Sequence, residues 1–140
     1  MRSEILGPVI ALVAWSTIMW FWMYVRRIPA MRAASIDIAK LVGGTGADLR
    51  GVLSGKDQWP ADNYNHLMEQ PTLFYAIALT LAVMGQGDGL NAIIAWAYVV
   101  LRIAHSLVQV TSNRVVVRFA LFALGTLPLI MLTLHAALAL

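Results

Sequence analysis

Ionisable and amide side chains recur at helical spacing inside three apolar segments of this 140-residue sequence. One stripe consists of Asp62, Asn65, His66 and Glu69, a second of Tyr98, Arg102, His105 and Gln109, and a third of Arg114 and Arg118. Residues three or four apart share one face of a helix. Charged groups that face lipid are costly, so each stripe is expected to point into a helical bundle. Glu69 and Arg102 are the ion pair that we expect first.

The depths of these groups along their helices coincide. At 1.5 Å per residue, Glu69 lies about 8 Å, His105 about 9 Å and Arg118 about 5 Å from the same end of the bundle. Arg102 lies about 13 Å deep on the same scale. Arginines outnumber the carboxylate in this layer, and a pocket with spare guanidinium groups favours an anionic ligand that carries a carboxylate. The alternative is a structural ion-pair network that binds nothing.

The elements that must position these groups are membrane-spanning helices. Apolar residues make up 60% of the chain and charged residues 12%, with a mean hydropathy of +0.74, whereas soluble domains carry about 25% charged residues. Spans are predicted at about 5–25, 64–84, 90–111 and 115–140, each near the length of about 20 residues that crosses a bilayer. We therefore predict one all-α domain over 1–140, an integral membrane four-helix bundle, with a single long loop at 26–61.

The distribution of basic residues predicts the orientation of the bundle. The long loop contains six of the ten, namely Arg26, Arg27, Arg32, Lys40, Arg50 and Lys56, and the turn at 85–89 contains none. By the positive-inside rule, this loop is expected in the cytoplasm and both termini outside. The rule also explains the net charge of +3, so no nucleic-acid partner is expected.

The absence of cysteine limits the chemistry of the chain. It excludes a protein thiolate nucleophile, a disulfide framework and thiolate metal sites. Any sulfur chemistry must therefore come from a substrate. The three histidines lie on separate segments without clustered carboxylates, so no metal site is expected.

Three motifs in order resemble the MAPEG family, the membrane-associated proteins in eicosanoid and glutathione metabolism. They are the segment 62–71 with Glu69-x-Pro71, the Arg102-x-x-His105 element, and the segment 113–119 with Arg114 and Arg118. The likeness covers the second to fourth predicted helices well, and the first, with residues 26–32, in general layout. The sequence looks like a bacterial-type branch of the family, which implies the bacterial inner membrane.

The resemblance implies a homotrimer that binds glutathione between neighbouring subunits, near the cytoplasmic face, and uses its thiol on lipophilic electrophiles or hydroperoxides. Arg118 corresponds to the arginine near the glutathione sulfur, which is the catalytic candidate. A nearby cation favours the nucleophilic thiolate over the thiol. The candidate ligand-binding residues are Arg32, Asn65, His66, Glu69, Arg102, His105, Gln109 and Arg114.

The sequence also departs from the family pattern. Gln109 stands where relatives often carry a tyrosine, Phe119 replaces a serine hydroxyl, and the segment 62–69 contains no arginine. The first hypothesis is a glutathione-dependent transferase or peroxidase-like enzyme for lipophilic small molecules. The alternative is a non-catalytic relative that binds lipid headgroups or amphiphilic small molecules in the same pocket. A small multidrug exporter is disfavoured because the first predicted span has no charge.

Overall fold

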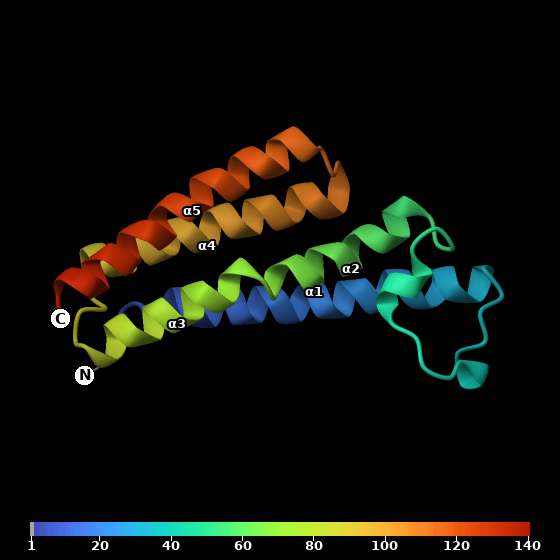
Figure 1. Ribbon diagram of the computed structural model, residues 1–140, viewed down its shortest axis with the longest axis horizontal. Helices are drawn as coiled ribbons and strands as arrows, with labels where there is room; N and C mark the ends of the chain where they lie inside the picture. The colour runs from blue at the N-terminus through green and yellow to red at the C-terminus, as the bar shows by residue number, and fades with distance from the viewer. Residues whose placement is uncertain (1) are drawn as a thin grey trace.

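The computed structural model describes residues 2–140, and within that range the chain is helical apart from turns and loops. The α-helices are α1 (Leu6–Ala33), α2 (Gly55–Leu67), α3 (Gln70–Val83), α4 (Leu90–Thr111) and α5 (Val115–Leu138). Two short 3₁₀ turns, Ile38–Lys40 and Gly46–Leu49, lie in the long loop. In Figure 1, α2 and α3 follow one another along α1, α4 and α5 form a hairpin beside them, and both termini lie at one end. We call that end the termini end and the opposite one the loop end.

Three of the helices are long and apolar enough to cross a membrane. Their mean hydropathy is 1.6 for α1, 1.6 for α4 and 2.2 for α5. Large apolar side chains on α1 and α5 are open to the surroundings, among them Phe21 and Phe119. Exposed apolar surface of this extent is favourable in contact with lipid and raises the free energy of a protein in water. The predicted integral membrane protein is thus supported, and the bounds predicted for the last two helices agree closely with α4 and α5.

The first helix extends further than predicted. It continues past Val25 to Ala33, and α2 begins at Gly55, so the loop between them is shorter than 26–61. The arginines that end the apolar run do not end the helix, because arginine, alanine and methionine all favour helical backbone. An ion pair of 2.8 Å between Arg26 and Asp57 joins the extension to α2.

The second predicted helix is broken. α2 ends at Leu67 and α3 begins at Gln70, and Glu69 between them has a non-helical ψ of −103°. Pro71 explains the break, because it has no N–H to donate to the Leu67 carbonyl and its ring clashes with that carbonyl. With 13 and 14 residues, α2 and α3 each fall short of the about 20 residues of a full span. Neither is among the helices long and apolar enough to cross a membrane alone.

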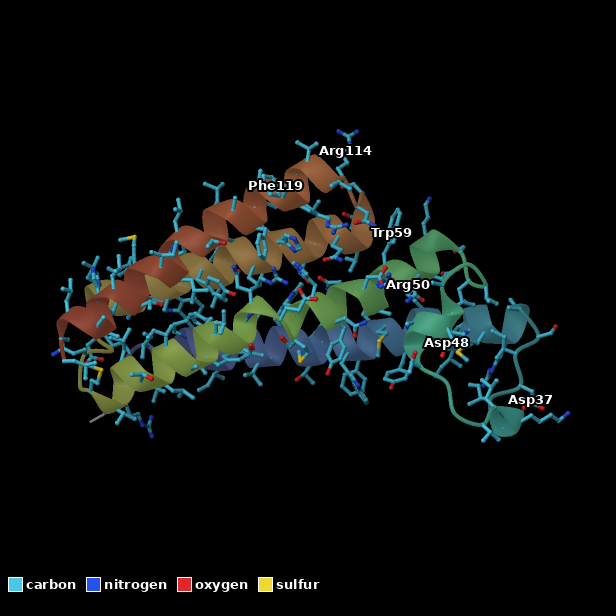
Figure 2. All side chains as sticks on the ribbon, in the orientation of Figure 1. Asp37, Asp48, Arg50, Trp59, Arg114 and Phe119 are labelled. Atoms are coloured by element: carbon cyan, nitrogen blue, oxygen red, sulfur yellow. The ribbon has the colours of Figure 1, made fainter. Side chains whose placement is uncertain are left out.

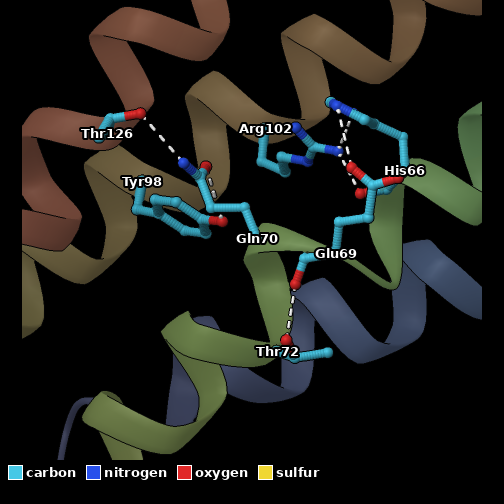
Figure 3. Close-up of polar contacts among 7 residues, drawn as sticks. All are labelled: His66, Glu69, Gln70, Thr72, Tyr98, Arg102 and Thr126. Atoms are coloured by element: carbon cyan, nitrogen blue, oxygen red, sulfur yellow. Dashed lines mark hydrogen bonds and ion pairs between the residues drawn. The ribbon is translucent and has the colours of Figure 1, made fainter.

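A hydrogen-bonded chain ties α3 to the α4–α5 hairpin next to the break. The Tyr98 hydroxyl donates to Gln70 Oε1 at 3.3 Å, and Gln70 Nε2 donates to Thr126 Oγ1 at 3.0 Å (Figure 3). Tyr98 also stacks on Phe74, with ring centroids 4.5 Å apart. Gln70 therefore links all three helices through one side chain.

Replacing Gln70 with leucine is expected to lower the free energy of unfolding by about 1–2 kcal/mol, because the change leaves the Tyr98 and Thr126 hydroxyls without this partner. Denaturant unfolding in detergent measures the effect. The same change at exposed Gln86 serves as the control. Equal stability of the two variants would contradict a structural role for Gln70.

Candidate functional site

Arg102 lies at the centre of the polar layer and is almost completely buried, with 3% of its surface exposed. Its Nη2 donates to the His66 carbonyl at 2.8 Å and lies 2.5 Å from His66 Nδ1 (Figure 3). At the end of α2 this carbonyl accepts only a long bond of 3.4 Å from the Glu69 N–H, so the shorter bond from Arg102 caps the break. Arg102 Nε and Nη1 have no hydrogen-bond partner in residues 2–140. A buried cation with two unpaired donor nitrogens is unfavourable unless a ligand supplies acceptors.

The contact with Arg102 determines the protonation of His66. A guanidinium group only donates hydrogen bonds, so His66 Nδ1 must be the acceptor and the ring proton sits on Nε2. That nitrogen lies 3.7 Å from Glu69 Oε2. The neutral His66 ring is therefore held between an arginine and a carboxylate.

The expected ion pair between Glu69 and Arg102 is wrong. No such pair is present within the described part of the chain, and the Glu69 side chain is 67% exposed and contacts His66 instead. The helix break is the physical reason. Glu69 no longer has helical backbone, so it leaves the face of α2 that its spacing predicted.

His105 of α4 is also buried, with 2% of its surface exposed. Its ring stacks on that of His66 at a centroid distance of 4.9 Å, and its Nδ1 has no hydrogen-bond partner among the described residues. The two histidines face a cavity of about 210 Å³. The cavity is lined by His66, His105, Val115, Arg118, Phe119 and Phe122. α2, α4 and α5 thus meet at one place, as the depths along the helices predicted.

Arg118 contributes the guanidinium that lines this cavity. Its Nη1 donates to Asn113 Oδ1, and its buried Nε has no partner within residues 2–140. Asn113 lies between α4 and α5 with a φ of +50°, a left-handed conformation that asparagine tolerates better than most residues. The turn that joins the two helices therefore also orients Arg118.

The other candidate residues lie away from this cavity. Asn65 is exposed on α2, and Arg32 is exposed at the end of α1. Arg114 is exposed just before α5, and Figure 2 shows it extending outward. Gln109 is buried one turn beyond His105, with its Oε1 unpartnered in the described chain. Of the candidate residues, His66, His105 and Arg118 line the cavity, and Arg102 and Glu69 contact His66 from outside it.

The stripe expected on the second helix does not point into the bundle as a whole. Asp62 pairs with Arg50 at 2.8 Å, and Asn65 is exposed, so of these polar residues only His66 reaches the cavity. The inward residue that the pattern missed is Asn63, which is fully buried and donates to Ser106 Oγ at 2.6 Å. Its place three residues before His66 was the available signal.

The arrangement favours binding of an anion. Arg102 and Arg118 both have unpartnered nitrogens within residues 2–140. Arg118 lines the cavity, Arg102 lies behind His66, and no carboxylate lines the cavity. Guanidinium groups bind carboxylates through two parallel hydrogen bonds. No hydroxyl side chain lines this cavity, so a cation is the available group to stabilise a thiolate.

Comparisons with known proteins agree with this architecture. The family model described as "MAPEG family" matches residues 5–138, which is nearly the whole chain. Neither the curated proteins nor the solved structures gave a match. The matched range includes every α-helix, the three polar residues that line the cavity (His66, His105 and Arg118) and Arg102 behind His66. The chain belongs to the MAPEG family.

Proposed function

We propose that this protein is a membrane-embedded enzyme that uses glutathione on lipophilic electrophiles or hydroperoxides. The observation that carries the proposal is the buried Arg102 guanidinium, with two nitrogens that lack a partner in residues 2–140. A glutathione carboxylate would supply the missing acceptors. Membership of the MAPEG family, which includes glutathione transferases and peroxidases, supports the same ligand.

The proposed chemistry divides between two arginines. Arg102 would hold a carboxylate, while Arg118, at the edge of the cavity, would lie near the sulfur and favour its thiolate form. A cation near a thiol lowers the free energy of the thiolate and so increases the reactive fraction. The apolar Phe119 and Phe122 on the same cavity wall would receive the lipophilic substrate from the membrane.

The size of the cavity supports a site that neighbouring subunits complete. Its volume of about 210 Å³ lies below the range of about 300–1,000 Å³ typical of small-molecule pockets. In the proposed homotrimer, a neighbouring subunit would enclose the rest of the ligand. Arg32 and Arg114, which are exposed in the single chain, are then available to the ligand of an adjacent subunit. The loop end would face the cytoplasm of a bacterial inner membrane.

The test is calorimetry of glutathione with the detergent-purified protein, followed by turnover with an activated aryl chloride and a lipid hydroperoxide. The proposal requires saturable binding, weaker in an Arg102→Met variant that loses the guanidinium with two unpartnered nitrogens, and turnover with one of the two substrates. S-methylglutathione should bind without reacting. No heat at millimolar glutathione would reject glutathione as the ligand.

The lining of the cavity also favours a second candidate, a relative that binds an amphiphile without chemistry. Gln109 and Phe119 replace the hydroxyl groups that family members often carry, and the cavity has no hydroxyl. Native mass spectrometry of gently extracted protein separates the two functions. A retained phospholipid that glutathione does not displace would favour the binding protein.

A further inference from the structure

A second cavity, which we call the loop-end pocket, lies where α1, α2 and α4 meet at the loop end. Its volume is about 150 Å³. It is lined by Trp22, Arg26, Lys56, Trp59, Pro60, Val110 and Thr111. Figure 2 shows Trp59 beside the end of α4. None of these residues lines the cavity at Arg118, so the two sites are separate.

The polar lining of this pocket is cationic. Arg26 uses its Nη2 to contact Asp57 at 2.8 Å, and the other Asp57 oxygen accepts from Ser54 Oγ at 2.6 Å. Asp57 is thus engaged by these partners and does not line the pocket. Arginine carries five N–H donors, so Arg26 has further donors to offer. Lys56 is exposed and forms no ion pair within the described residues.

The pocket lies at the level of the lipid headgroups. The uncharged run of α1 ends at Val25, next to Arg26, and α4 ends at Thr111. Helix ends and the first basic residue mark the change from hydrocarbon to the polar interface. Trp22 and Trp59 flank the pocket, and tryptophan is enriched at this depth. Ile18, one turn below Trp22, is 52% exposed, and Leu107, one turn before Val110, is 46% exposed.

We propose that the loop-end pocket binds the phosphate of an anionic phospholipid. Arg26 and Lys56 contact the phosphodiester, the two tryptophans enclose the glycerol region, and an acyl chain follows the exposed apolar surface of Ile18 and Leu107. Basic pockets between transmembrane helices select anionic headgroups. Each basic residue near the membrane surface raises the affinity for anionic lipid about fivefold. The lipid is a bound partner of the fold and is independent of any thiol chemistry.

The test measures the affinity of short-chain phosphatidylglycerol for the whole protein in neutral detergent by native mass spectrometry. Lys56→Gln should weaken binding roughly fivefold. Lys40→Gln is the matched control, because Lys40 lies outside the pocket and pairs with Asp37. The unmodified protein should bind phosphatidylcholine more weakly than phosphatidylglycerol. Both variants should have the melting temperature of the unmodified protein.

Two outcomes would overturn the proposal. Equal weakening in the Lys56 and Lys40 variants would show general attraction of a basic loop for anionic lipid, without a site. Displacement of the lipid by millimolar inorganic phosphate would show an ion site that does not require the lipid. The proposal stands if only the Lys56 variant loses affinity and phosphate does not compete.

Discussion

Replacing Arg102 with methionine is expected to weaken glutathione binding at least a hundredfold without lowering the stability of the unliganded protein. Two donor nitrogens of Arg102 have no partner within residues 2–140. Hydrogen bonds from a charged donor contribute about 1.5–3 kcal/mol each, and two of them correspond to a factor of about 10² or more. Removing a buried, poorly paired charge is often neutral or stabilising. This gain offsets the lost hydrogen bond to the His66 carbonyl.

The measurement pairs calorimetry of glutathione with thermal unfolding in detergent. Arg50→Met is the matched control, because Arg50 is 64% exposed and pairs with Asp62 away from the cavity. One combination of results would instead give Arg102 a purely structural role. If the Arg102 variant unfolds far below the unmodified protein, and the unmodified protein binds no anion, then Arg102 serves only to cap the end of α2.

The helices whose apolar runs end at clear turn residues were predictable from the sequence, even though α5 continues through Pro128. The runs that became α4 and α5 are apolar, and turn residues bound them at Gly85–Gly89 and Ser112–Asn113. Periodicity and length suffice for such segments. The break at Glu69 was not predicted, although Pro71 was visible, because hydropathy treats 64–84 as one span. Whether a membrane helix tolerates a break depends on which distant group satisfies the freed carbonyls, and here that group is Arg102.

The composition of the site was predicted better than its orientation. Rise per residue is a local property, so the shared depth of His105 and Arg118 followed from counting residues. The rotation of α2 about its own axis, in contrast, depends on the helices that pack against it. α2 packs against both α1 and α4, and this packing buries Asn63 while leaving Asn65 exposed. The polar stripe alone gave no means to choose between these neighbouring positions.

Replacing Arg118 with alanine is expected to reduce kcat at saturating glutathione by about 10²–10³ while the protein stays folded. That range is typical for losing one group that stabilises an anion during reaction. Arg118 is half-buried, and its hydrogen bond to Asn113 is local to the turn, so its loss leaves the helix packing intact. Turnover with the activated aryl chloride and the ultraviolet absorbance of the glutathione thiolate both report the change. Lys40→Ala controls for the loss of one positive charge outside the bundle.

The Arg118→Lys variant tests how the cation acts. Lysine restores a positive charge but not the planar guanidinium. In the described chain that group is oriented by the bond that its Nη1 donates to Asn113 Oδ1. If charge alone stabilises the thiolate, lysine should recover most of the lost thiolate absorbance. If the fixed orientation matters as well, the thiolate should return while kcat stays low, because a flexible ammonium group does not hold the sulfur toward the electrophile. Unchanged kcat in the alanine variant would remove Arg118 from the mechanism and leave His66 and His105 as the polar groups that line the cavity.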